Sequence, residues 1–222
     1  MQLSALPGSH YLRMIGVPIE QIPGIWSIIS FSIGLIIVLL LLIPDIKNRH
    51  FTRGRASRWE AVQWSIIGIF MVFAAQYAAA FIELLLGIEP GSENTEAIVE
   101  FAKVVPEFII VISIIGPILE EIVFRLVIFG VLYKRFNFWF AALFSSLIFA
   151  VTHFDFDHLL IYTAMGFVFA FLYAKTKRII VPIVAHISLN LFVSLINIVF
   201  AERIQEIIKQ LEQQTSFIIG GF

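Results

Sequence analysis

The sequence predicts an all-α protein, a polytopic membrane helix bundle with about six transmembrane spans. Hydrophobic residues make up 59% of its 222 residues and charged residues 14%, against roughly 45–50% and about 25% in ordinary soluble domains. Mean hydropathy is +0.94. A soluble globule of this composition would expose large apolar patches, so we expect much of the surface to face lipid.

Six apolar runs predict the spans, because a helix needs roughly 20 apolar residues to cross a bilayer core about 30 Å thick. The first run is too long to be the apolar part of a signal peptide. The third contains charged residues and is predicted as one crossing kinked near Gly116-Pro117, since proline interrupts the helical hydrogen bonds. In chain order the runs are 22–44, 61–82, 104–133, 136–152, 159–174 and 179–201.

Charge predicts the orientation and excludes some functions. Most of the 15 Lys and Arg residues fall in the connections 44–59, 134–135 and 175–178, which are predicted to face the cytoplasm, with both termini on the other side. The acidic connection 88–100 is expected to be a loop on that other side. A net charge of −1 provides no basic field for nucleic acid, and the absence of cysteine excludes disulfides and thiolate nucleophiles.

The predicted organisation has three parts. Residues 1–103 form an N-terminal region with two spans. Residues 104–200 form a helical core that carries the polar motifs. Residues 201–222 form an amphipathic tail, in which isoleucines and charged residues alternate at helical spacing.

Ionisable residues inside a span cost about 2.5–3.5 kcal/mol each, so their presence calls for a reason. In the third run, Glu121 and Arg125 are four residues apart and can form an ion pair on one helix face. Glu120 points about 100° away and has no partner on its own helix. A carboxylate left over in this way suits a general base, although salt bridges to neighbouring spans are the alternative.

Two further motifs carry histidine. Phe149 precedes His153 by four residues at the end of the fourth run, and His186 precedes Asn190 by four residues in the sixth. Taken alone, either motif is typical of an interfacial residue or of polar contacts between helices. Together with Glu120 they offer a base for water and donors for an oxyanion, which is the equipment for hydrolysing an amide. Glu120, His153 and His186 could alternatively hold a zinc ion with a bound water.

The three motifs, Glu120-Glu121-x-x-x-Arg125, Phe149-x-x-x-His153 and His186-x-x-x-Asn190, resemble in this order the signatures of the CPBP family. That family groups type II CAAX prenyl endopeptidases with bacterial bacteriocin-processing and immunity proteins, also called Abi. The resemblance covers roughly residues 104–200 and implies an intramembrane endopeptidase. It implies that Glu120 and His153 activate the water and that His186 and Asn190 stabilise the oxyanion. Glu121, Arg125 and Phe149 would support the site.

No cofactor is favoured, because the His-Glu-x-x-His helix of many zinc proteases is absent; zinc remains the alternative. The expected partners are the bilayer and a peptide or protein substrate, lipidated or membrane-bound. The expected location is a prokaryotic cell membrane. Two other functions stay open: a non-catalytic immunity or scaffold protein of the same fold, and a proton-coupled transporter, since intramembrane Glu and His also serve proton relays.

Overall fold

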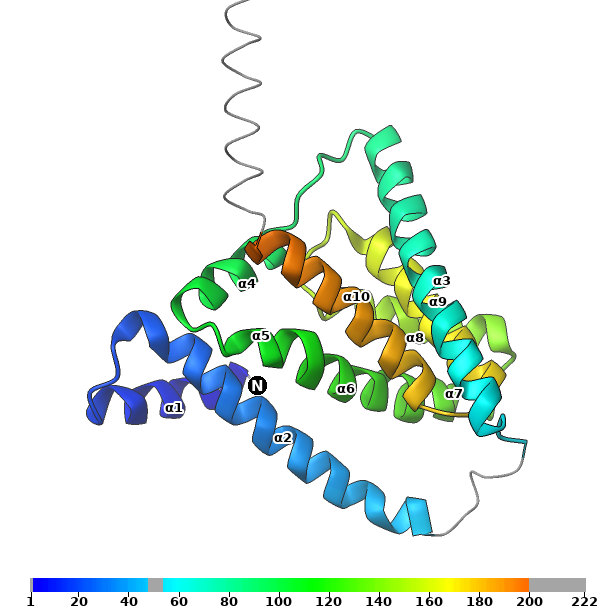
Figure 1. Ribbon diagram of the computed structural model, residues 1–222, viewed down its shortest axis with the longest axis horizontal. Helices are drawn as coiled ribbons and strands as arrows, with labels where there is room; N and C mark the ends of the chain where they lie inside the picture. Colours follow the sequence, from blue (N-terminus) through cyan, green and yellow to red (C-terminus); the bar gives the residue numbers. More distant parts are fainter. Residues whose placement is uncertain (1, 48–53, 200–222) are drawn as a thin grey trace, which may run out of the picture.

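The computed structural model describes residues 2–47 and 54–199, and over these residues the chain is helical, with no β-strand (Figure 1). The all-α, polytopic class is thereby confirmed. Helices long and apolar enough to span a bilayer cover Ile19–Pro44, Arg58–Leu85, Leu159–Thr176 and Ile180–Asn197. They correspond to predicted spans one, two, five and six. The helices that contain them are α2 (Ile22–Lys47), α3 (Arg58–Leu85), α9 (Leu159–Thr176) and α10 (Ile180–Val199).

The predicted third span is a series of consecutive helical segments that changes hydrogen-bond pattern. It comprises α5 (Phe108–Ile110), the π-helical η2 (Val111–Ile115), α6 (Gly116–Glu121), the π-helical η3 (Ile122–Phe129) and α7 (Gly130–Tyr133). Pro117 lies in the first turn of α6, where its missing N–H is tolerated. The discontinuity expected at Gly116-Pro117 is therefore a switch from π- to α-helix. π-Helical turns occur frequently at functional sites.

The predicted fourth span is the 14-residue α8 (Phe138–Val151). At 1.5 Å per residue it is about 21 Å long, shorter than the hydrocarbon core. Its start is capped by Asn137, whose side chain accepts a hydrogen bond of 2.9 Å from the backbone N–H of Phe140. Beyond its end, Phe154 adopts a left-handed φ of 55°, which turns the chain away from the helix. This span is therefore shorter than the apolar run suggests.

Two helices were not predicted, and one of them corrects the expected acidic loop. α1 covers Gln2–Met14, and α4 covers Glu93–Val104 within the region expected to be a loop. The side chain of Ser92 accepts a hydrogen bond of 3.1 Å from Thr95 N–H and so caps α4. A serine before an acidic first turn is typical of a helix start. The predicted amphipathic tail, 201–222, lies outside the described residues.

The core of the bundle lies among α3, α8, α9 and α10, with α9 packed against both α8 and α3 (Figure 1). The helices α8 and α9 approach closely at Gly166, where an added Cβ would lie 2.9 Å from Ser146 Cβ. Phe149, Phe169 and Leu172 are fully buried in this core. α2 contacts η2 and α6 instead, and much of its surface is exposed, as expected of a helix that faces lipid.

Candidate active site

Glu120, His153, His186 and Asn190 line one cavity of about 1090 Å³. Glu120 ends α6 together with Glu121, His153 lies in the turn after α8, and His186 and Asn190 lie on α10. Three segments far apart in the sequence therefore bring the four predicted chemical groups to one space. Phe149 lines the same cavity, whereas Glu121 and Arg125 are fully buried beside it.

The expected ion pair within the third span is formed. Arg125 Nε lies 3.2 Å from Glu121 Oε2, and neither side chain is exposed. The guanidinium of Arg125 also lies 4.7 Å from the ring centre of Phe149 and 5.4 Å from that of Phe169. Aromatic faces attract a cation, so these rings help to hold a buried arginine. Phe149 thus packs against the buried guanidinium of Arg125 at the wall of the cavity.

His186 lies between the two adjacent glutamates. Its Nδ1 is 3.0 Å from Glu121 Oε1, a hydrogen bond in which the carboxylate accepts. Its Nε2 faces Glu120 Oε2 at 3.7 Å, too far for a direct hydrogen bond. The Glu120 side chain is 33% exposed, in contrast to the buried Glu121. Glu121 therefore orients the imidazole, while Glu120 and Nε2 stay available to a third molecule.

The hydrogen bonding of His153 leaves one ring nitrogen for chemistry. Its Nδ1 lies 2.8 Å from the carbonyl oxygen of Phe149. Because a carbonyl only accepts, Nδ1 carries the hydrogen, and in the neutral ring Nε2 keeps a lone pair. Burial lowers the pKa of His153, an effect that the nearby charge of Glu120 partly offsets. A lowered pKa keeps the ring neutral, so Nε2 can accept a proton or a hydrogen bond from water.

Asn190 is fixed by the neighbouring π-helical segment. Its Nδ2 donates a hydrogen bond of 2.9 Å to the carbonyl oxygen of Ile112, in η2. An amide nitrogen carries two hydrogens, so the second can be donated elsewhere. Asn190 therefore combines a fixed position with a spare donor at the cavity wall.

Further polar residues at the cavity were not predicted as part of a site. Glu83, Ser92, His158 and Tyr162 line the same cavity, and Asp155 contacts two of them. In the sequence, Glu83 directly follows the apolar run 61–82 and His158 directly precedes the run 159–174. Both are buried, at 2% and 7% exposure. The signal in the sequence was the position of Glu83 at the end of an apolar run, and this position does not indicate that Glu83 contacts His158.

The zinc alternative involves Glu120, His153 and His186. Among them, no group of three His, Asp or Glu side chains is arranged to hold a metal ion. His186 directs Nδ1 to Glu121 and His153 directs Nδ1 to a backbone carbonyl. Glu120, His153 and His186 therefore share a cavity without forming a metal-binding cluster.

Comparisons with known proteins agree with the position of the motifs. The family model for type II CAAX prenyl endopeptidases, Rce1-like, matches residues 103–192, which contain all three motifs. YdiL of Bacillus subtilis (strain 168), named as a membrane peptidase, is 48% identical over 199 residues, which are 89% of this chain and 80% of YdiL. The membrane-embedded CAAX protease MroQ of Staphylococcus aureus (strain USA300) is 37% identical over 205 residues, which are 87% of this chain and 81% of MroQ. No solved structure gives a significant match.

The order of the motifs, their shared cavity and the extent of these two matches lead to one conclusion. The chain belongs to the Rce1-like family of type II CAAX prenyl endopeptidases and is a membrane protease.

Proposed function

We propose that the chain is an intramembrane endopeptidase that hydrolyses a peptide bond near the membrane with a water molecule activated by Glu120 and His153. One observation carries the proposal: a carboxylate, two imidazoles and a carboxamide from three separate segments line one cavity. Each would be costly in a lipid-embedded bundle without a task. The substrate is a peptide or protein, lipidated or membrane-bound.

The first step forms the bond between the water oxygen and the scissile carbonyl carbon. Glu120 accepts the proton of the water, and Nε2 of His153 accepts a hydrogen bond that orients it. The carbonyl oxygen becomes an oxyanion. Nε2 of His186, which faces the cavity beside Glu120, donates to the oxyanion, and Asn190 donates the second hydrogen of Nδ2. The C–N bond then breaks as Glu120 returns its proton to the leaving amine.

This route uses the carboxylate rather than a metal ion as the activator of water. The support for it is that Glu120, His153 and His186 do not form a metal-binding cluster among the described residues. Activity is therefore expected to persist after dialysis against a chelator. Loss of activity on dialysis, restored by added Zn²⁺, would contradict this part of the proposal.

The test is hydrolysis by the purified chain in liposomes. The probes are a farnesylated peptide that ends in a CAAX sequence and an unmodified single-span peptide, with new termini identified by mass spectrometry. We expect cleavage of at least one probe by the wild type and a loss of about 1,000-fold or more in Glu120→Ala and His153→Ala. Glu107→Gln, which changes an exposed glutamate before α5, is the matched control and should cleave normally. Equal turnover in all four proteins would overturn the proposal.

The orientation completes the proposal. Arg55 Nε donates to the carbonyl oxygen of Lys177 at 3.2 Å, and the guanidinium of Arg178 donates to that of Ala56, so two basic connections lie together. This basic end faces the cytoplasm and both termini lie on the other side of the membrane. The proposed membrane is that of a prokaryotic cell, a proposal that the bacterial origin of both relatives supports.

Single cysteines can test the orientation, because the chain has none of its own. Asp157→Cys and Arg135→Cys place a thiol at exposed positions in two different connections. A membrane-impermeant maleimide should label Asp157→Cys, but not Arg135→Cys, in intact cells. The reverse pattern would invert the orientation.

A further inference from the structure

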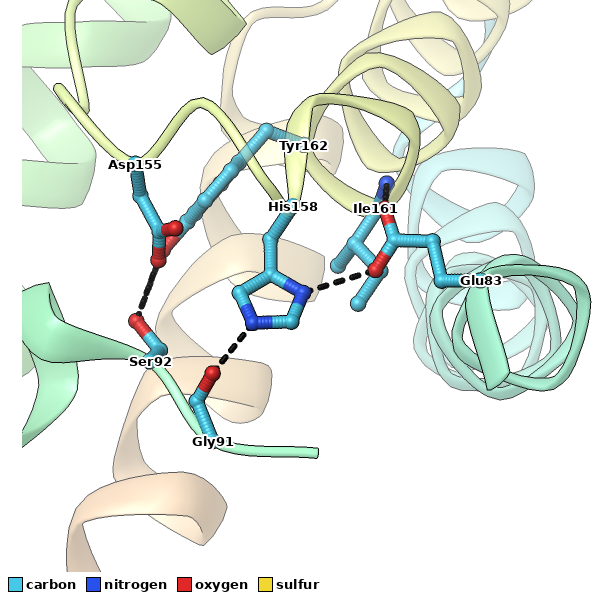
Figure 2. Close-up of polar contacts among 7 residues, drawn as sticks. All are labelled: Glu83, Gly91, Ser92, Asp155, His158, Ile161 and Tyr162. Atoms are coloured by element: carbon cyan, nitrogen blue, oxygen red, sulfur yellow. Dashed lines mark hydrogen bonds and ion pairs between the residues drawn. The ribbon is translucent and has the colours of Figure 1, made fainter. Parts of the chain in front are cut away.

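A second group of polar side chains lies next to His153 and has no role in the proposed chemistry. We call Glu83, Gly91, Ser92, Asp155, His158 and Tyr162 the loop cluster (Figure 2). Its members come from the end of α3, from the connection to α4, from the connection between α8 and α9, and from the first turn of α9. The cluster therefore joins two connections that are more than 60 residues apart, as in the contact between Ser92 and Asp155.

The pair Glu83–His158 fixes the end of the α8–α9 connection. His158 Nδ1 lies 2.7 Å from Glu83 Oε2, and Nε2 contacts the carbonyl oxygen of Gly91 (Figure 2). The other oxygen of Glu83 accepts a hydrogen bond of 3.2 Å from Ile161 N–H in the first turn of α9. Glu83 thus caps α9 from another helix. This arrangement fixes the position at which α9 begins and hence that of Tyr162.

Ser92 and Asp155 hold the middle of the same connection. The hydroxyl of Ser92 donates to Asp155 Oδ2 at 2.6 Å while it accepts from Thr95 N–H at the start of α4. The hydroxyl of Tyr162 lies 3.5 Å from Asp155 Oδ2 and 3.5 Å from Ser92 Oγ. Asp155 is only 8% exposed. The position of Tyr162 is therefore fixed by the contacts of its hydroxyl group as well as by the position of its backbone in the first turn of α9.

His153 depends on neighbours for its orientation, because it lies in a turn rather than in a helix. The next residue, Phe154, has a left-handed φ of 55°, a conformation that costs energy for a residue with a side chain. The His153 ring stacks on Tyr162, with ring centres 4.1 Å apart and planes at 25°. Its other neighbour is Phe149, at 4.6 Å and 66°. The ring is therefore held between two aromatic side chains, of which the loop cluster fixes one.

We propose that Tyr162 is a positioning residue for His153, and that the loop cluster holds Tyr162 in place. The inference rests on the proposed function, in which Nε2 of His153 orients the water. Tyr162 touches neither the water nor the substrate in this account. It acts by keeping the imidazole at the angle at which Nε2 faces the cavity, and the stacked ring rather than the hydroxyl supplies most of that effect.

The experiment compares Tyr162→Ala, Tyr162→Phe and Tyr173→Ala with the wild type in liposomes, using the probe that the wild type cleaves. Misplacement of a catalytic group by about 1 Å can cost 100-fold in rate. We therefore expect kcat to fall about 30- to 100-fold in Tyr162→Ala with KM changed less than about 3-fold. Tyr162→Phe keeps the stacked ring and should restore kcat to within about 3-fold. Tyr173→Ala removes the same side chain from the far end of α9 and should leave kcat unchanged.

A spectroscopic readout makes the test independent of the substrate. In detergent micelles with ¹⁵N-labelled histidine, the wild type and Tyr162→Phe should show His153 in a single state with the hydrogen on Nδ1. Tyr162→Ala should show several states of that ring. Wild-type kcat together with an unchanged His153 spectrum in Tyr162→Ala would overturn the inference.

A parallel His153→Ala variant separates the two claims. An inactive His153→Ala beside a fully active Tyr162→Ala would remove the positioning role and leave the proposed function intact. An active His153→Ala would remove the proposed function itself.

Discussion

Two buried histidines in this bundle each contact a glutamate, and they differ in what remains unused. In the loop cluster, both ring nitrogens of His158 and both oxygens of Glu83 contact partners. At the cavity, the hydrogen bond that His186 forms within the described part of the chain runs from Nδ1 to Glu121, while Nε2 faces Glu120 at 3.7 Å. Glu120 is also one third exposed.

The difference indicates what each pair does. A pair whose donors and acceptors are all hydrogen-bonded stabilises the structure around it, because none of these groups remains to bind a substrate. A pair in which one ring nitrogen has no hydrogen-bond partner, next to a part-exposed carboxylate, can bind a substrate or a water molecule and take part in its reaction. Residue type does not distinguish the two pairs; their remaining hydrogen-bonding capacity does.

The largest expected effect follows substitution at the cavity. His186→Asn should lower kcat/KM about 100- to 1,000-fold, because the oxyanion loses the Nε2 donor. The thermal midpoint should change little, since the asparagine amide lies near the position of Nδ1 and can still donate to Glu121. Steady-state cleavage in liposomes and thermal unfolding in detergent measure the two quantities. Activity within about 3-fold of the wild type would remove His186 from the chemistry.

His158→Gln should give the opposite pattern. Glu83 would remain buried without its partner, and breaking a buried pair on one side costs about 3 kcal/mol. Unfolding in detergent should therefore occur earlier, whereas kcat per folded molecule should fall far less than in His186→Asn. The double variant Glu83→Gln/His158→Gln should recover part of the lost stability. A His158→Gln protein as stable as the wild type would show that the pair contributes nothing.

His158 and His153, which both lie outside the spans, should respond to pH in opposite directions. Burial by itself lowers the pKa of His158, but the hydrogen bonds to Glu83 and to the Gly91 carbonyl, with the charge of Asp155, outweigh it and raise the pKa above 6.5. Its stabilisation is therefore complete below pH 6.5 and is lost as pH rises through the raised pKa. The pKa of His153 is lowered, so activity should be lost only as pH falls through a value below 6.5.

Thermal unfolding and kcat/KM, each measured across pH, check both directions. His158→Gln is the control for the first, since it should remove the loss of stability at high pH. An unchanged pH profile of stability in this variant would assign that loss to other groups.

The smallest expected effect is at the edge of the loop cluster. Ser92→Ala removes the cap of α4 and the hydrogen bond to Asp155, and a lost cap costs about 1 kcal/mol. Activity should fall less than about 3-fold, because Tyr162 keeps its stacking on His153. Ser9→Ala is the matched control: its exposed hydroxyl contacts only the Leu6 carbonyl among the described residues. Equal unfolding midpoints for the two variants would show that the Ser92 cap does not contribute measurably to stability.

Much of the fold could be predicted because apolar run length is a direct signal of a membrane helix. The runs 22–44, 61–82, 159–174 and 179–201 each overlap a helix long enough to span a bilayer. The short α8 could not be predicted, since the apolar residues continue to Thr152 while the backbone approaches its turn at Phe154. The π-helical segments η2 and η3 have no sequence pattern of their own.

The candidate site, like the fold, has a part that could be predicted from the sequence and a part that could not. A spacing of four residues places Glu121 beside Arg125 and His186 beside Asn190 on one helix face, so these neighbours could be predicted from the sequence. The pairing of His186 with Glu121 across 65 residues, and of His158 with Glu83 across 75, depends on how separate helices pack. No local pattern encodes such pairs, and for this reason the loop cluster was missed although the motif residues were found.

The most direct test of the account measures Glu120→Gln and Glu83→Gln side by side in liposomes, with activity expressed per folded molecule. Both substitutions remove one carboxylate charge and keep the shape of the side chain. We expect Glu120→Gln to lose about 1,000-fold in kcat at an unchanged unfolding midpoint, whereas Glu83→Gln should unfold earlier and keep kcat within about 10-fold. Wild-type activity in Glu120→Gln would contradict the role of Glu120 as the base that activates water, whatever the result for Glu83→Gln.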